Sequence, residues 1–194
     1  MSWTDSRAMK RTDITRWADW ARWITVTLAL CGLLPSLSAG QDLEAVKTKI
    51  RKQFPSVLQL STTELAAWLG HTNRAQPMLV DARSPAEYAV SHLPGARWVD
   101  TKAPAAEVVS RLGTNQPIVV YCSVGYRSSR LAERLQQAGC TNVFNLDGSI
   151  FQWANEDRLL ERDGHLVKEV HPYNKTFGQL LRPEYRAAAT PVKE

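Results

Sequence analysis

The chain has 194 residues, of which 44% are hydrophobic and 22% charged, and its formal net charge at pH 7 is +5. This composition is ordinary for a soluble globular protein, and the length allows one domain with a real core plus extensions. Three cysteines are too few for a disulfide scaffold. No basic cluster interleaved with aromatic residues is present, so nucleic-acid binding is unsupported.

Residues 1–40 are predicted to be a cleaved export signal. A basic stretch that ends at Arg22 precedes the apolar run 23–34, which Pro35 breaks before the small residues of 36–40. The run has about 12 residues, fewer than the roughly 20 that a membrane-spanning helix needs. We therefore expect an exported, periplasmic protein. The alternative is an uncleaved membrane anchor, whose tryptophans would sit at the lipid interface.

Strands and helices are predicted to alternate along most of the remaining chain. The expected strands are residues 57–60, 78–81, 96–99, 118–121 and 143–146. The expected helices are residues 42–54, 61–69, 105–112 and 128–139, with a closing helix entered over 147–153. This alternation predicts an α/β domain with a mostly parallel sheet flanked by helices.

The predicted domain occupies residues 57–156, and an N-terminal helical segment, residues 41–56, precedes it. Residues 157–194 form a C-terminal extension. An Asp163-Gly164 turn between alternating residues predicts a hairpin at its start. The aromatic residues of the following tail are expected to lie against the domain.

The stretch that carries the chemistry runs from Ile118 to Arg130. Four β-prone residues predict a buried strand, Cys122 ends it, and a short loop containing Gly125 leads into a helix. Backbone N–H groups and the helix dipole at such a turn stabilise a thiolate, and Arg127 adds a positive charge beside it. Cys122 is therefore the candidate nucleophile. The alternative is a cysteine that only fills the core.

Three sequence motifs resemble those of the rhodanese family of sulfurtransferases. The six residues from Cys122 to Arg127 match the length of that family's active-site loop. Residues 81–88 resemble its Asp-x-Arg and Glu-[Tyr/Phe] signature, and residues 92–96 resemble its His-[Ile/Leu]-Pro-Gly-Ala signature. The resemblance implies a doubly wound rhodanese-like fold. Ser149 stands where the family usually has a second glycine.

The resemblance implies sulfur transfer through a persulfide on Cys122. The donor would be thiosulfate or a similar small anion, the acceptor a thiol or a cyanide-like compound, and no cofactor or metal is needed. Arg127 is expected to orient the donor, while Ser123 and Tyr126 line the entrance. The loop residues expected to bind the substrate or the persulfide are Ser123, Val124, Gly125, Tyr126 and Arg127.

Three further residues are expected to support the site without taking part in the chemistry. Asp81, at a strand end, can accept N–H bonds from the next turn, and Arg83 is expected to pair with Glu87. His92 invites a role as a catalytic base. In the resembling family, however, this histidine is a fold residue before the Pro-Gly turn, so we assign it to the fold.

Two other functions remain open. A rhodanese-like module that relays sulfur to a protein, or binds a partner without turning over small molecules, is the main alternative, because Cys122 does not separate an enzyme from a relay. Arsenate reduction or phosphatase action is disfavoured, since the related enzymes have a loop one residue longer. The shorter loop favours a sulfur-sized anion.

No disulfide is expected between Cys122 and Cys140. The predicted helix between them has about 11 residues, which separates its ends by roughly 16 Å. A disulfide requires the two Cα atoms to lie within about 7 Å. Cys140 is instead expected to be a small apolar residue at the edge of the core.

Overall fold

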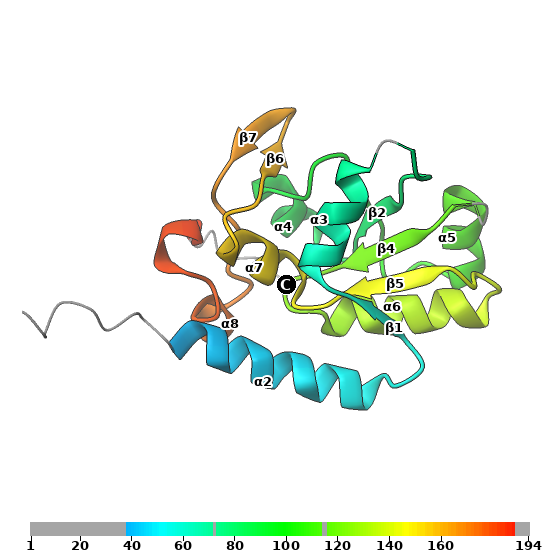
Figure 1. Ribbon diagram of the computed structural model, residues 1–194, viewed down its shortest axis with the longest axis horizontal. Helices are drawn as coiled ribbons and strands as arrows, with labels where there is room; N and C mark the ends of the chain where they lie inside the picture. The colour runs from blue at the N-terminus through cyan, green and yellow to red at the C-terminus, as the bar shows by residue number, and fades with distance from the viewer. Residues whose placement is uncertain (1–37, 72, 114–115, 189–194) are drawn as a thin grey trace, which may run out of the picture. The chain divides into compact units, whose positions relative to one another are not determined.

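A computed structural model describes residues 38–71, 73–113 and 116–188 (Figure 1). Its helices are α2 (Ser38–Gln53), α3 (Thr62–Gly70), α4 (Pro85–Val90), α5 (Ala105–Leu112), α6 (Tyr126–Gln137), α7 (Ser149–Asn155) and α8 (Lys175–Gly178). Its strands are β1 (Leu58–Leu60), β2 (Met78–Asp81), β3 (Arg97–Trp98), β4 (Ile118–Tyr121), β5 (Val143–Leu146), β6 (Leu160–Arg162) and β7 (His165–Val167). A short 3₁₀ helix covers Pro183–Tyr185.

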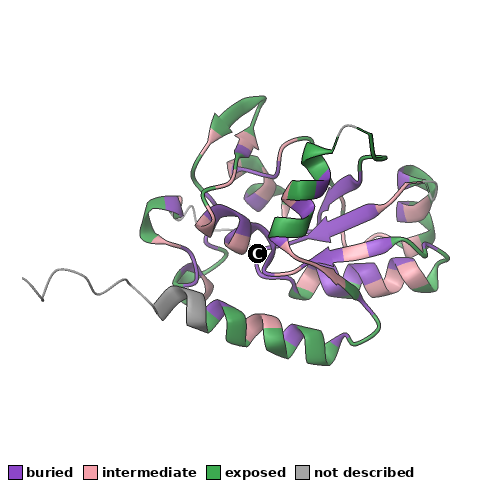
Figure 2. Ribbon diagram, in the orientation of Figure 1, coloured by how far each residue is buried: buried purple, intermediate pink, exposed green. Residues whose placement is uncertain are grey.

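A five-stranded sheet in the order β1-β5-β4-β2-β3 forms the centre of the domain, and all its paired strands are parallel. Helices lie on both faces, with α5 packed on α6 and α3 on α7 (Figure 1). Strand β4 is buried along its whole length (Figure 2), which explains its unbroken apolar sequence. The predicted doubly wound α/β fold is thereby confirmed.

The sheet order creates a switch point between β2 and β4. After β2 the chain continues to β3 on one side, and after β4 it continues to β5 on the other. The loops that follow β2 and β4 therefore diverge, and ligands of doubly wound sheets bind in the crevice that such loops leave. In the register of the two strands Asp81 lies beside Tyr121, so Cys122 emerges at this crevice.

Helix α6 begins at Tyr126, two residues before the predicted start. Gly125 precedes it with φ +114°, a left-handed conformation that a residue with a Cβ rarely adopts. The chain can therefore turn from the loop into the helix within one residue. As a result the helix N-terminus lies directly behind the Cys122 loop.

Helix α2 packs against the domain through the buried side chains of Leu43 and Ile50, and Phe54, directly after the helix, is buried as well. It begins at Ser38, four residues before the predicted helix start. The predicted export signal lies outside the described residues, except for residues 38–40, which are the first of α2. Within the part of the chain that the structure describes, no helix is both apolar and long enough to cross a membrane.

The C-terminal extension folds back onto the domain. Strands β6 and β7 form the predicted hairpin, with Asp163 and Gly164 at its turn in left-handed conformations. A bridge joins β6 to the domain, because the backbones of His92 and Glu161 exchange two hydrogen bonds of 2.9 Å. Beyond the hairpin the extension contributes further buried side chains to the core: Val170, Leu180, Leu181 and Tyr185.

Candidate active site

The thiol of Cys122 lies at the carboxyl end of β4 and is 1% exposed. The Gly125 N–H donates a hydrogen bond of 3.2 Å to Cys122 Sγ. The first bond of the helical ladder joins Ser129 N–H to Gly125 O, so the N–H groups of the three preceding residues are not used within the helix. The sulfur atom thus faces a turn that is rich in backbone donors.

Opposing effects act on the pKa of the Cys122 thiol, and the net result is a lowered pKa. Burial raises it. The positive charge of Arg127 and hydrogen bonds from the hydroxyl and N–H of Ser128 and from the Gly125 N–H outweigh that effect. The Ser128 hydroxyl has one proton, and it donates either to the thiolate or to Asn145 Oδ1, which lies 2.6 Å away. The turn therefore stabilises a buried thiolate.

Ser149 holds the backbone of the nucleophile from the opposite side. Its hydroxyl accepts a hydrogen bond of 3.1 Å from the Cys122 N–H and donates one of 3.0 Å to Leu146 O. Ser149 is fully buried and has φ +52°, so a non-glycine residue occupies a left-handed conformation at this turn. The serine thus has the left-handed backbone conformation that a glycine would adopt, and its hydroxyl adds an acceptor for the Cys122 N–H.

Arg127 makes its closest contacts with a buried carboxylate. Its guanidinium donates hydrogen bonds of 2.8 and 2.7 Å to the two carboxylate oxygens of Glu87, at the start of α4. Burial would raise the pKa of Glu87, but Arg127, the Ser84 N–H and the charge of Arg83 lower it to about 2. The pair therefore stays ionised at neutral pH, and it joins the Cys122 loop to the loop that follows β2.

Ser123 lies beneath this pair, so the prediction that its side chain lines the entrance is wrong. It is 3% exposed. Its hydroxyl donates to Glu87 Oε1 at 3.0 Å and accepts from Arg127 Nη2 at 2.9 Å. The side chain therefore points into the protein to satisfy the ion pair.

Asp81 and Arg83 form a separate buried pair. Asp81 accepts the Arg83 N–H at 2.9 Å, as expected, and also receives the guanidinium at 2.6–3.1 Å. The predicted pairing of Arg83 with Glu87 is wrong. Residues two apart in extended chain point the same way, so Arg83 meets Asp81, while Glu87 caps α4 at Ser84 and reaches Arg127. Both pairs support the site.

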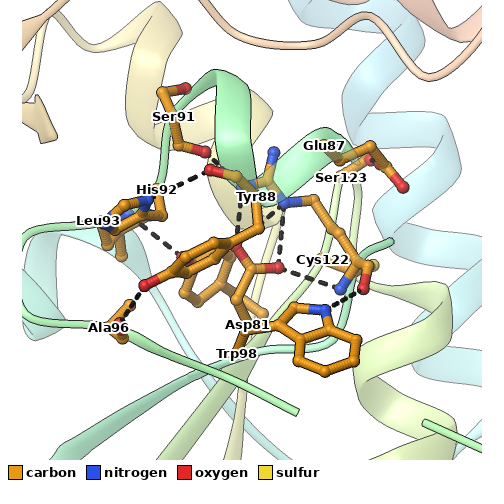
Figure 3. Close-up of polar contacts among 12 residues, drawn as sticks. Asp81, Glu87, Tyr88, Ser91, His92, Leu93, Ala96, Trp98, Cys122 and Ser123 are labelled. Atoms are coloured by element: carbon orange, nitrogen blue, oxygen red, sulfur yellow. Dashed lines mark hydrogen bonds and ion pairs between the residues drawn. The ribbon is translucent and has the colours of Figure 1, made fainter. Parts of the chain in front are cut away.

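His92 contacts groups of the fold. Its ring stacks on Tyr88 with centroids 4.0 Å apart, and its Nδ1 lies 3.2 Å from Tyr88 O (Figure 3). Its Nε2 lies 3.8 Å from a carboxylate oxygen of Glu161 in the hairpin. These contacts fix the turn before β3 and its junction with the C-terminal extension, in keeping with the structural role assigned to this residue.

The remaining loop residues divide between core and surface. Val124 is buried, whereas Tyr126 is 41% exposed. The Tyr126 ring meets Phe54 edge-on at 5.5 Å, and its hydroxyl accepts a hydrogen bond of 3.2 Å from Gln53 Nε2. Helix α2 therefore forms one side of the loop, although it lies outside the predicted domain.

Four residues of the site were not predicted. Ser128 contributes to the low pKa of the thiol, Asn145 bonds to Ser128, and Ser149 supports the Cys122 backbone. Tyr173, from the C-terminal extension, lies 4.8 Å from the Arg127 guanidinium. The serine in place of the usual second glycine was the one available signal, and no local pattern marks Tyr173.

The arrangement is suited to a thiolate nucleophile at Cys122. Donors converge on the sulfur of Cys122, and the ionised Glu87–Arg127 pair keeps the loop in place. Among the described residues, no group of three or more His, Cys, Asp or Glu side chains is gathered as a metal site requires. The lowered pKa of the Cys122 thiol and the donors around its sulfur support nucleophilic chemistry at this residue.

Comparison with known proteins agrees with this geometry. The model of the family described as "Rhodanese-like domain" matches residues 61–156. The uncharacterized protein YqhL of Bacillus subtilis is 33% identical over 81 residues, which cover 40% of this chain and 61% of YqhL. The thiosulfate sulfurtransferase GlpE of Pseudomonas aeruginosa is 33% identical over 75 residues, which cover 39% of this chain and 67% of GlpE.

The solved structure of the BH2092 protein from Bacillus halodurans has the same fold. It superposes with a TM-score of 0.54 at 21% identity, over 71% of this chain and 97% of that protein. The residues matched by the family model, 61–156, include the Cys122 loop and both supporting ion pairs. On the strength of the family match, the relatives and the fold, this chain belongs to the rhodanese-like domain family.

Proposed function

We propose that the protein is a sulfurtransferase in which Cys122 accepts sulfur from thiosulfate or a similar small anionic donor. The observation that carries the proposal is the thiol itself: its pKa is lowered although it is almost fully buried. A cysteine that only filled the core would have a raised pKa, as Cys140 has because of its burial. The name of the relative GlpE, a thiosulfate sulfurtransferase, adds support.

In the first step the Cys122 thiolate attacks the outer sulfur of thiosulfate. The sulfur–sulfur bond of the donor breaks, sulfite leaves with the electron pair, and Cys122 carries a terminal persulfide anion. The donors of the 125–128 turn then stabilise the negative charge on the transferred sulfur. In the second step a thiol or cyanide attacks that sulfur, and the electron pair returns to Cys122 Sγ.

Mass spectrometry of the intact protein after treatment with thiosulfate tests this mechanism. We expect one added sulfur atom, which disappears when cyanide or a thiol is added. Cys140→Ser is the matched control and should gain the same mass, whereas Cys122→Ser should gain none. A wild-type protein that gains no sulfur, or a Cys122→Ser variant that gains one, would exclude the mechanism.

The principal alternative is a relay or interaction module that exchanges sulfur with a partner protein. Tyr126 lies beside the loop with its side chain exposed, where a partner protein could contact it. A steady thiosulfate:cyanide turnover supports the enzyme, while loading without turnover supports the relay.

We also propose that the protein is exported. The support is the sequence of residues 1–40, with its basic stretch, short apolar run and small residues. N-terminal sequencing of periplasmic material should find a chain that begins near Gln41. Full-length chain in the membrane fraction would instead indicate an uncleaved anchor.

A further inference from the structure

One residue of the C-terminal extension has an unusual backbone conformation. Tyr173 has φ +63°, in the left-handed region that suits glycine and that bulky residues rarely adopt. Its neighbour Asn174, a residue type that tolerates this region better, is extended with φ −148°. Strained residues persist where the surrounding structure enforces them, and they cluster at functional sites. The contacts of the Tyr173 ring therefore bear on its function.

The segment around Tyr173 is held by short-range contacts. The Tyr173 N–H donates a hydrogen bond of 3.0 Å to His171 Nδ1. The Tyr173 ring meets Phe177 edge-on, with centroids 5.7 Å apart. Gly178 packs so closely on Pro172 that a Cβ added to this glycine would lie 2.9 Å from Pro172 Cβ. These contacts fix the direction in which the Tyr173 ring points.

The extension that carries Tyr173 has its own links to the domain. Asn155, at the end of α7, donates a hydrogen bond of 2.8 Å to Leu180 O and accepts one of 2.9 Å from the Arg182 N–H. The Arg182 guanidinium donates a hydrogen bond of 2.7 Å to the carboxylate of Asp157. None of these links involves the tyrosine ring. The extension can therefore stay in place when the ring is removed.

The Tyr173 ring contacts the cation of the catalytic loop. The guanidinium carbon of Arg127 lies over the ring, 4.8 Å from its centroid. The nitrogens of the same guanidinium donate hydrogen bonds to Glu87 and to the Ser123 hydroxyl. A cation–π contact needs no hydrogen-bond donor. The ring therefore restrains Arg127 independently of the ion pair.

The place of this cation matters for the nucleophile. Burial raises the pKa of the Cys122 thiol, and the charge of Arg127 is the largest of the effects that lower it. The Arg127 side chain is 29% exposed, so water reaches part of it and screens its charge. An aromatic ring attracts the cation and keeps water from one side of it. The ring of Tyr173 therefore limits both the movement and the hydration of Arg127.

We propose that Tyr173 is a positioning residue, whose ring holds the Arg127 guanidinium beside the Cys122 loop, and that the C-terminal extension folds back to supply it. The inference rests on the proposed function, because it concerns the same loop. The family model ends at residue 156, so the ring comes from outside the matched domain. Without the ring, the guanidinium should move and become more hydrated, and the Cys122 thiolate should lose part of its stabilisation.

The variant Tyr173→Gly tests the proposal, because it removes the ring and relieves the backbone strain at the same time. We expect the relief to offset the lost ring contacts, so the midpoint of urea unfolding should change little. Alkylation of Cys122 at pH 7 should slow about threefold, the size of a partly exposed cation–π contact. The pH profile of alkylation should show a raised thiol pKa. Tyr173→Phe keeps the ring and should keep the wild-type profile.

Asp163→Gly is the matched control. Asp163 also has a left-handed backbone, with φ +51°, but it lies exposed at the hairpin turn, so its replacement should not change the alkylation of Cys122. Tyr173→Asn is a second variant without the ring, in a residue type that tolerates the left-handed region, and it should behave like Tyr173→Gly. A wild-type profile in both ringless variants would overturn the proposal, as would an equal loss in Tyr173→Phe.

A double-mutant cycle tests whether the ring acts through Arg127. Glu87→Gln/Arg127→Gln replaces both charges of the pair, so that neither is left buried alone. Adding Tyr173→Gly to this background should leave the alkylation rate unchanged. A further threefold loss would show that the ring acts on the thiol by another route and would overturn the positioning role.

The alkylation experiment separates this inference from the proposed function. It needs no sulfur chemistry, so it still reports on Tyr173 if Cys122 fails to load with thiosulfate. Where loading occurs, its rate in Tyr173→Gly should fall in the same proportion as the alkylation rate, and Tyr173→Phe should load like the wild-type protein. Slower alkylation with an unchanged loading rate would overturn the role of Tyr173 in sulfur transfer.

Discussion

Helix α6 has a buried cysteine at each end, and the two thiols have opposite properties. Cys122 is 1% exposed and Cys140 is 3% exposed, and both are free thiols, as expected. The pKa of Cys122 is lowered, whereas burial raises the pKa of Cys140. Burial therefore does not decide reactivity here; the donors and charges around the sulfur do.

The end of the helix accounts for part of this difference. Cys122 precedes the N-terminus of α6, where unpaired N–H groups and the positive end of the dipole favour an anion. Cys140 follows the C-terminus, where the dipole has the opposite sign. Arg127, held in place by Glu87, adds a positive charge that lowers the pKa of Cys122, whereas burial is the cause of the raised pKa of Cys140.

Replacing each cysteine in turn should give the largest contrast. Cys122→Ser should reduce thiosulfate:cyanide sulfur transfer to background, because a hydroxyl cannot hold a persulfide. Cys140→Ser should retain activity within about twofold, since it changes one atom at the edge of the core. Steady-state assays of both variants measure the contrast. Comparable activity in Cys122→Ser would remove the distinction between the two ends.

Arg127→Ala should cause the largest loss of stability. It leaves the carboxylate of Glu87 buried without its cation, and removal of one partner from a buried pair costs about 3 kcal/mol. Urea unfolding monitored by tryptophan fluorescence measures the change. Arg130→Ala, one turn further along the same helix and exposed, is the control and should stay within about 0.5 kcal/mol. A similar result for both variants would show that the Glu87 pair contributes little.

Acid should weaken the same end of the helix. The pKa of Glu87 is about 2 in the folded protein, compared with 4.5 for a glutamate without these interactions. A lowered folded pKa contributes stability above pH 4.5, and this contribution is lost as the pH falls from 4.5 towards 2. The full loss is at most about 3 kcal/mol at 1.36 kcal/mol per unit.

Unfolding free energies measured between pH 6 and pH 2.5 follow this loss. The variant Glu87→Gln has no charge to lose at this position, so its stability should depend less on pH across that range. Wild-type and variant curves of equal slope would show that other carboxylates dominate acid unfolding.

Ser149→Gly should have the smallest effect on stability and a specific effect on the nucleophile. Glycine relieves the left-handed strain but removes the acceptor of the Cys122 N–H, so we expect a net change within about 1 kcal/mol. The looser backbone should raise the thiol pKa of Cys122 slightly. The rate of alkylation as a function of pH measures it, with Cys140 as the internal reference. If the pH dependence of alkylation is unchanged in the variant, Ser149 contributes only to packing and does not affect the pKa of Cys122.

Much of the domain could be predicted because its signals are local. Strands β2, β4 and β5 have the predicted bounds, since their apolar runs are buried on both faces of the sheet. Helix α3 begins within one residue of its predicted start, where Ser61 and Glu64 form a capping box. Each of these features depends on residues within one turn or one strand.

The errors concern side chains whose partners are distant in the sequence. Arg83 could reach either Asp81 or Glu87 by spacing alone, and the sequence did not show that Arg127, 40 residues after Glu87, takes that carboxylate. The same long-range pair turns Ser123 inward. Which of two carboxylates an arginine pairs with depends on where all the other charged side chains lie.

The sequence by itself determined the nucleophile and its immediate frame. An apolar strand, Cys122, a short loop with Gly125 and a helix lie in one continuous stretch, and their geometry follows from local backbone preferences. The tertiary structure decided what tunes that nucleophile. The parallel sheet brings the ends of β2, β4 and β5 together, which places Glu87 on Arg127 and Ser149, 27 residues after Cys122, under its N–H. Folding of the extension then adds Tyr173 over Arg127. Such contacts arise only when the core is packed, because strand order and register depend on how all the buried faces fit at once.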